Sequence, residues 1–164
     1  MSKFDRRYLR LARFIAQDWS KDPSTKVAAV IADKTGKPVS FGFNGFAAGV
    51  ADTPERLSDR PTKYALMVHA ERNAIIFADR SRLDGATMYL WPFPPCSECA
   101  SMIAQAGLAR LVTIHPTAEH LQRWEQSFKT MRIVMRETGV QLITHDPDFL
   151  DFNEGPAYTP REYA

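Results

Sequence analysis

The chain has 164 residues, of which 45% are hydrophobic and 24% are charged. This length and composition fit one globular domain with a buried core, and they exclude a disordered or fibrous chain. The net charge of +2 is too small to indicate general nucleic-acid binding. No apolar run approaches the roughly 20 residues of a membrane span, and the polar N-terminal segment lacks an apolar signal region. We therefore expect a cytoplasmic protein with neither membrane nor nucleic-acid partners.

The first third of the chain predicts one helix, two strands and a long loop. Apolar residues at three- and four-residue spacing between Tyr8 and Trp19 predict an amphipathic helix. Residues 27–32 form an apolar run of strand length, and residues 38–43 form a second strand that is close enough to pair with the first as a hairpin. Residues 45–63 mix Gly, Pro, Asp and Arg without periodicity, which predicts a loop of the kind that often covers a functional site.

The rest of the chain alternates helices and strands. Helices are predicted over residues 69–80, 97–106 and 119–137, and strands over residues 87–91, 110–114 and 141–143. The long helix before the last strand makes a parallel crossover feasible. We therefore predict an α/β domain over residues 1–145, followed by a Pro-containing tail over residues 146–164.

Three side chains that can ligate a metal ion lie at the starts of two predicted helices. His69 begins one helix, while Cys96 and Cys99 begin the next and lie about one helical turn apart. A helix N-terminus favours the thiolate that a metal ion requires. Three protein ligands leave the fourth tetrahedral position of a zinc ion open for water, which is typical of a catalytic site rather than a structural one.

Glu71 follows His69 by two residues and is predicted to carry protons. Zinc lowers the pKa of a bound water to about 7, so that a hydroxide nucleophile exists at neutral pH. A neighbouring carboxylate can take the proton from this water, pass it to a ring nitrogen and finally protonate the departing amine, which leaves as ammonia. Glu71 is therefore predicted to act as a proton shuttle and not as a zinc ligand.

Other interpretations of these residues are less well supported. A redox-active Cys-x-x-Cys pair needs no His-Ala-Glu upstream. A structural zinc site needs a fourth ligand, and none of the remaining histidines, at positions 115, 120 and 145, lies at a close ligand spacing. The Asn44-Gly45 pair after the second strand is either a tight turn or a functional asparagine, and the sequence favours neither.

The chain resembles the cytidine and deoxycytidylate deaminase family, and within it the deoxycytidylate (dCMP) deaminases. The His-x-Glu and Pro-Cys-x-x-Cys motifs carry the likeness to the family, and residues 20–27, 44–46 and 63–64 carry the likeness to the subgroup. The resemblance implies a three-layer α/β/α fold with a five-stranded mixed sheet whose last two strands are parallel. It also implies deamination of dCMP to dUMP and ammonia, a small-molecule nucleotide substrate, and a homo-oligomer, either a dimer or a hexamer.

By the same resemblance, His69, Cys96 and Cys99 bind Zn²⁺ and Glu71 shuttles protons. Asn44 is implied to contact the sugar, and the backbone amide of Ala70 to hold the pyrimidine O2. Residues 51–63 contain no Cys or His that could form the second zinc site of some relatives, so we expect one zinc ion per chain.

Four further residues are predicted to contact the substrate. Arg60 and Lys63 are expected to bind its phosphate, because their segment leads directly into the helix that carries His69. Trp91 and Pro95 lie in a lengthened approach to Cys96 and are expected to border the pocket, for which His115 and Trp124 are additional candidates. Two alternatives stay open, namely deamination of another base (adenosine in tRNA, guanine or a pathway intermediate) and a non-catalytic zinc-stabilised binding domain.

Overall fold

The computed structural model describes residues 3–151, and its centre is a five-stranded sheet in the order β2-β1-β5-β6-β7. Strand β1 pairs antiparallel with β2 and β5, whereas β5, β6 and β7 run parallel to one another. The predicted mixed sheet with parallel final strands is therefore confirmed. The strands are β1 (Ala28–Ala32), β2 (Pro38–Phe43), β5 (Thr87–Trp91), β6 (Arg110–Ile114) and β7 (Gln141–His145).

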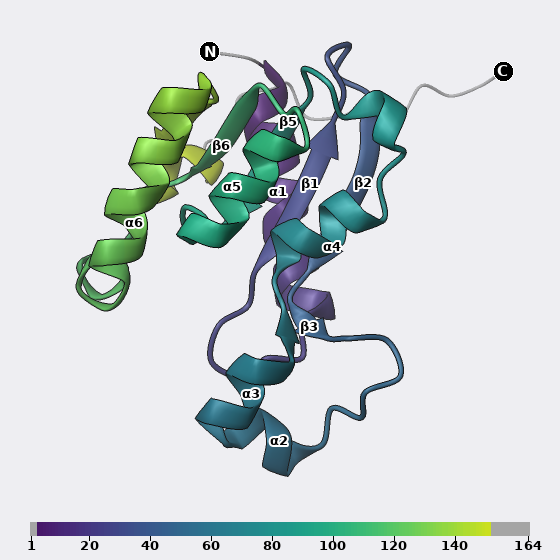
Figure 1. Cartoon of the computed structure of the whole chain (residues 1–164), viewed down its shortest axis with the longest axis vertical. Helices are drawn as coiled ribbons and strands as arrows, with labels where there is room; N and C mark the ends of the chain where they lie inside the picture. The colour runs from purple at the N-terminus through teal and green to yellow at the C-terminus, as the bar shows by residue number, and fades with distance from the viewer. Residues whose placement is uncertain (1–2, 152–164) are drawn as a thin grey trace, which may run out of the picture.

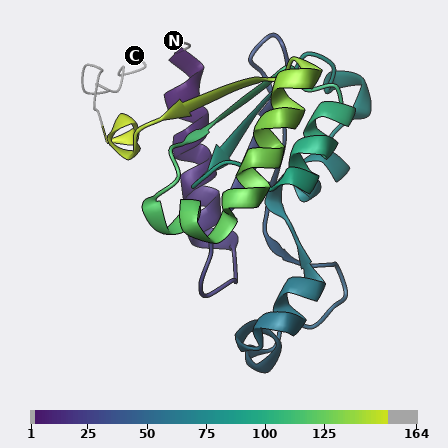
Figure 2. The ribbon, with the colours of Figure 1, turned by 60° about the vertical axis from the view of Figure 1, so that its left-hand side comes forward.

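Helices cover both faces of this sheet, which confirms the expected three layers. Helix α1 (Lys3–Trp19) packs on one face, and α4 (Ala70–Ile76), α5 (Ser97–Gln105) and α6 (Ala118–Thr138) lie on the other (Figures 1 and 2). All five residues of β1 are buried, because a central strand covered on both faces has no solvent-facing side. Within residues 3–151, no helix has the length and apolar content needed to cross a membrane.

Residues 45–68 contain two strands and two helices, so the loop predicted over residues 45–63 is confined to residues 47–53, and the prediction is wrong for most of the rest. They form the ribbon β3 (Gly45–Phe46) and β4 (Met67–Val68) and the helices α2 (Pro54–Ser58) and α3 (Arg60–Leu66), which project from one end of the sheet (Figure 1). Thr53 and Asp59 cap these helices, and a proline follows each cap in the first turn. Helices this short are not visible as apolar periodicity, but their caps and prolines could have indicated them.

Two predicted helices differ from the observed ones in ways that affect the site. The helix expected over residues 69–80 ends at Ile76, and a separate 3₁₀ turn, Arg80–Arg82, follows where Asp79 caps it. Helix α6 is interrupted at Trp124, whose φ of −121° and ψ of 17° are not helical. This break divides α6 close to the start of α5.

The segment after β7 packs on helix α1. Residues Pro147–Leu150 form a 3₁₀ turn in which Leu150 is only 2% exposed, and the guanidinium Nε atoms of Arg6 and Arg10 donate to the carbonyls of Phe149 and Leu150. The boundary expected after residue 145 stays a prediction. Residues 152–164 of the expected tail lie outside the described residues.

Candidate metal centre and active site

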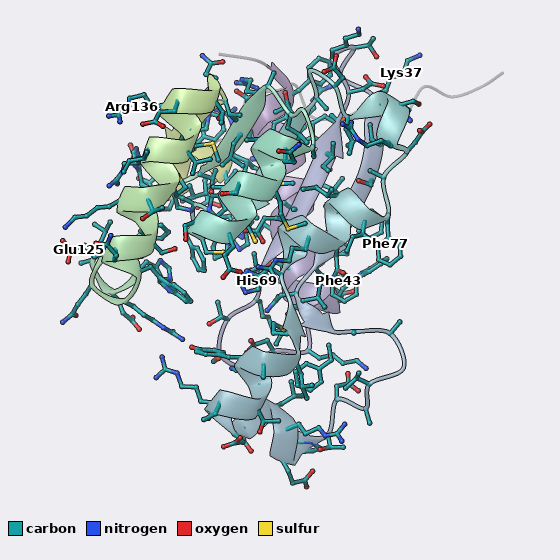
Figure 3. The ribbon with its side chains drawn as sticks, in the orientation of Figure 1. Lys37, Phe43, His69, Phe77, Glu125 and Arg136 are labelled. Carbon is teal, nitrogen blue, oxygen red and sulfur yellow. The ribbon has the colours of Figure 1, made fainter. Side chains whose placement is uncertain are left out.

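The starts of helices α4 and α5 meet at one end of the helical layer. His69 is the N-cap of α4, and Cys96 is the N-cap of α5, where its Sγ accepts a hydrogen bond from the backbone N–H of Cys99. Figure 3 shows His69 at this end of the helical layer, above α3. Residues that are far apart in the sequence thus come together because two helices of one layer begin side by side.

The three predicted ligands have the spacing of a metal site. The Nδ1 atom of His69 lies 3.6 Å from Cys96 Sγ and 3.3 Å from Cys99 Sγ, and all three ligand atoms lie within 4.8 Å of one another. Tetrahedral zinc with Zn–S of about 2.3 Å and Zn–N of about 2.0 Å separates its ligand atoms by roughly 3.5 Å. The donor set and its spacing therefore fit a zinc ion.

A glycine in β2 lets α4 approach the sheet closely. A Cβ atom on Gly42 would lie 2.3 Å from Ala74 N and 2.5 Å from Ala70 O, which is too close for any side chain. Two hydrogen bonds also hold α4 against β2: Ser40 Oγ donates to the carbonyl of Ala74, and Asn73 Nδ2 donates to the carbonyl of Phe43. The position of the His69-Ala70-Glu71 segment therefore depends on a residue in another element.

The protonation of the two thiols is unequal. Hydrogen bonds from Cys99 and His69 lower the pKa of Cys96 to about 4, although burial opposes this shift. The same contact with Cys96, together with burial, raises the pKa of Cys99. The pKa of His69 is raised, mainly by its hydrogen bond with Cys96. The site thus holds one thiolate ready to ligate a cation.

Glu71 is a buried carboxyl group beside these ligands. It is 4% exposed, and burial raises its pKa, because a charge is poorly solvated there. It lines the same cavity as His69 and Cys96. This arrangement places a proton-holding group next to the metal ligands, as the motif predicts.

The cavity above these residues has a volume of about 360 Å³. Asn44 and Ala70, which are predicted to contact the substrate, line this cavity, and so does Trp124. A second cavity of about 210 Å³ adjoins it, with Thr25, Phe93, Arg123 and Trp124 in the walls of both. The other residues of the main cavity are Asp22, Thr25, Val27, Tyr64, Met67, His69, Glu71, Phe93, Pro94, Cys96, Ser97, Glu98, Arg123, Ser127 and Phe128.

Asn44 is held rigidly by its neighbours. Its side-chain Oδ1 accepts from Ser20 Oγ at 2.7 Å and from the N–H of Val27 at 2.8 Å, and its Nδ2 donates to the carbonyl of Thr25 at 2.8 Å. An amide nitrogen carries two hydrogens, so one remains for a ligand. Asn44 therefore ties the end of β2 to residues 20–27.

Four predicted substrate contacts are absent from the described cavity wall. Lys63 is buried against Asp22, and Arg60 donates to Tyr64 Oη.

Trp91 packs with the apolar cluster between the sheet and α1, with Arg13 over its ring. Pro95 is outside the lining, although its neighbour Pro94 belongs to it. His115 bonds to Thr144 and also lies outside the cavity lining among the described residues.

Arg123 and Asp22 line the cavity but were not predicted as site residues. Arg123 is the one Arg or Lys in the wall of the main cavity within the described residues, and it donates to Tyr64 Oη. No local motif marks it, because it reaches the cavity through the packing of α6 beside α5. Asp22 belongs to the 20–27 segment that carries the subgroup resemblance, which is a signal that could have indicated it.

Comparison with known proteins agrees with this site. Residues 2–115 match the family described as "Cytidine and deoxycytidylate deaminase zinc-binding region". An uncharacterised deaminase of Aliivibrio fischeri, from the luxG 3′ region, is 37% identical over 150 residues, which cover 92% of this chain and 99% of that protein. Deoxycytidylate deaminase of Mus musculus is 31% identical over 164 residues, covering 94% of this chain and 90% of the mouse protein.

A solved structure shares the fold. The dCMP deaminase of cyanophage S-TIM5, solved in complex with dCMP and dUMP, superposes with a TM-score of 0.67. It is 24% identical and covers 88% of this chain and 99% of the phage protein. At this identity the likeness concerns the fold.

Proposed function

The chain belongs to the cytidine and deoxycytidylate deaminase family, and we propose that it hydrolyses the exocyclic amine of dCMP to give dUMP and ammonia. The observation that carries this proposal is one cavity whose wall, among the described residues, contains two members of the His-Cys-Cys metal group, His69 and Cys96, together with the buried carboxyl group of Glu71 and one arginine, Arg123. The named activity of the mouse relative and the nucleotides bound to the phage enzyme support the choice of dCMP.

We assign one Zn²⁺ ion per chain to His69, Cys96 and Cys99. When bound there, the ion supplies a Lewis acid that activates water for attack on the amine-bearing carbon. His69 is held at the start of α4, and Cys96 and Cys99 are held at the start of α5, whose partial positive charge favours the thiolate of Cys96.

Glu71 moves the protons of the reaction in this proposal. It accepts one proton of the attacking water and delivers it to the ring nitrogen. It then takes the proton of the hydroxyl group formed on the attacked carbon and delivers it to the departing amine, which leaves as ammonia. Its burial supports this role, because burial raises the pKa of Glu71 and so favours the protonated carboxyl that delivers a proton.

Backbone and side-chain donors hold the rest of the nucleotide. The N–H of Ala70 lies in the first turn of α4, where helix geometry provides no carbonyl partner, so it is available to the pyrimidine O2. The remaining N–H of Asn44 faces the sugar. Arg123 binds the 5′-phosphate, because a guanidinium is matched to phosphate oxygens and the wall offers no other Arg or Lys among the described residues.

The test is ammonia release from zinc-loaded protein that is offered dCMP, deoxycytidine, guanine or tRNA separately. We expect turnover of dCMP, a marked preference for it over deoxycytidine, and no turnover by Glu71→Gln protein that retains its zinc. Turnover of guanine or tRNA adenosine in place of dCMP would overturn the substrate assignment. Unchanged activity in Glu71→Gln would overturn the role of Glu71.

A further inference from the structure

Asp22 is a buried carboxylate in the wall of the proposed substrate cavity. Its side chain is 5% exposed, and Lys63 Nζ lies 3.0 Å from its Oδ1. Oδ1 also accepts from the N–H of Ser24 at 2.9 Å, from Ser24 Oγ at 2.9 Å and from the N–H of Thr25 at 3.2 Å. Within residues 3–151, every hydrogen bond recorded for this carboxylate ends on Oδ1, so Oδ2 remains an available acceptor.

The carboxylate is ionised despite its burial. Burial alone would raise the pKa of Asp22, but the hydrogen bonds from Ser24, Lys63 and Thr25 outweigh it and lower the pKa. A charged oxygen of this kind is a strong acceptor and rejects other anions.

Asp22 and Asn44 are joined through Thr25, which lines the cavity with them. Thr25 donates its N–H to Asp22 Oδ1 and accepts from Asn44 Nδ2 through its carbonyl. The pair offers the cavity one free acceptor, Asp22 Oδ2, and one free donor, the second Nδ2 hydrogen of Asn44. A hydroxyl group satisfies both, because it donates one hydrogen and accepts another.

We propose that Asp22 is a specificity-determining residue that accepts a hydrogen bond from the free 3′-hydroxyl of the substrate. This inference rests on the proposed function, because 3′-OH is the one free sugar hydroxyl of dCMP. The free Oδ2 has no hydrogen to donate to the oxygens of a 3′-phosphate, which are acceptors themselves, so an internal residue of a nucleic acid chain is rejected. The protein therefore acts on free nucleotides, with Arg123 and Asp22 contacting the two ends of the sugar-phosphate.

The first test compares three substrates on the unaltered protein. The analogues are 2′,3′-dideoxycytidine monophosphate, which has no 3′ group, and 3′-amino-3′-deoxy-dCMP, whose 3′ nitrogen is a cationic donor when protonated. We expect the dideoxy analogue to lose about 10- to 100-fold in kcat/KM, the range of one hydrogen bond to a charged group. The amino analogue is expected to retain or exceed the kcat/KM of dCMP if Asp22 is the contact, because a carboxylate accepts a hydrogen bond from an ammonium group. If the Asn44 amide were the contact, the analogue would be rejected, because an N–H donor cannot bind an ammonium group.

The second test repeats the series with Asp22→Asn and with the matched control Asp52→Asn, which alters a carboxylate paired with Lys21 outside the cavity. Asp22→Asn is expected to lower kcat/KM for dCMP and to change kcat/KM for the dideoxy analogue less than about threefold. The variant then no longer discriminates between dCMP and the dideoxy analogue. A purely structural role would lower both values equally, and Asp52→Asn should alter neither.

The outcomes separate this inference from the proposed function. If dCMP is not deaminated, the proposed function fails. If dCMP is deaminated and the dideoxy analogue reacts equally well, the role of Asp22 fails and the function stands. If Asp22→Asn does not fold, rejection of the amino analogue by the unaltered protein still overturns the role of Asp22.

Discussion

Lys63 Nζ and Asp22 Oδ1 form an ion pair at 3.0 Å between side chains that are 7% and 5% exposed. The pair joins helix α3 of the projection to the segment after α1, and Ser24 Oγ accepts a further hydrogen bond from Lys63 at 2.6 Å. Lys63 was predicted to bind phosphate, but the pair neutralises its charge. The structure therefore supports a role in holding Asp22 and the cavity wall in place.

Replacing Lys63 with Met should lower the free energy of unfolding by about 3–5 kcal/mol, because it leaves a buried carboxylate without its cation. Chemical denaturation monitored by circular dichroism measures this change. The matched control is Lys21→Met, which removes the exposed Lys21–Asp52 pair and should have no measurable effect. Equal stability of both variants would contradict the structural role of Lys63.

Replacing Arg123 with Gln should raise KM for dCMP about 10- to 100-fold, because one charge-assisted hydrogen bond to phosphate is lost. The KM for deoxycytidine, which has no phosphate, should stay the same. Arg136→Gln is the control, since Arg136 is exposed on the same helix (Figure 3). A parallel loss for both substrates would show that Arg123 acts on structure and not on phosphate.

Removal of the metal should abolish ammonia release and lower the melting temperature, because His69, Cys96 and Cys99 would lose their shared cation. Dialysis against a chelator, followed by zinc addition and elemental analysis, measures both effects. Cys99→Ser should bind less than one zinc ion per chain. Full activity after complete zinc removal would contradict the assignment.

Acidification should destabilise the fold through His145. Burial lowers the pKa of His145. The charge of Asp5 opposes this shift, and the charge of Arg110 adds to it. The Nε2 atom of His145 is buried without a hydrogen bond. The unfolded chain therefore takes up the proton first, and stability falls as the pH drops below 6.5 toward the folded-state pKa. His145→Phe, which retains an aromatic ring against Phe149, should lose less stability between about pH 7 and pH 5. Equal losses in pH-dependent denaturation would contradict this prediction.

The expected homo-oligomer should use the apolar end of α4. Ile76 and Phe77 are 64% and 73% exposed and adjacent, and Figure 3 shows Phe77 at the outer edge of the molecule. Exposed apolar patches of this kind often mark interfaces. Light scattering should show an oligomer that Phe77→Glu dissociates and that Phe14→Glu, on α1, leaves intact. A monomeric wild-type protein would contradict the expectation.

Local patterns in the sequence were sufficient for most of the fold and for the metal group. The apolar run over residues 27–32 and the helical periodicity over residues 119–137 each report burial that the element itself creates, and both elements were observed. His69 with Glu71, and Cys96 with Cys99, each share one helix start, where spacing in the sequence determines spacing in space. The short helices α2 and α3 were missed, because a helix of one or two turns carries no periodic signal.

The tertiary structure decided which charged side chains face the cavity. Lys63 and Arg60 are close to His69 in sequence, yet they bind Asp22 and Tyr64 of the cavity wall and do not line the cavity themselves. Arg123 is distant in sequence, and the packing of α6 beside α5 brings it into that wall. The residue types and spacing of the sequence determined the fold class and the metal ligands. The direction of a long charged side chain depends on partners from other elements, and only the folded chain shows them.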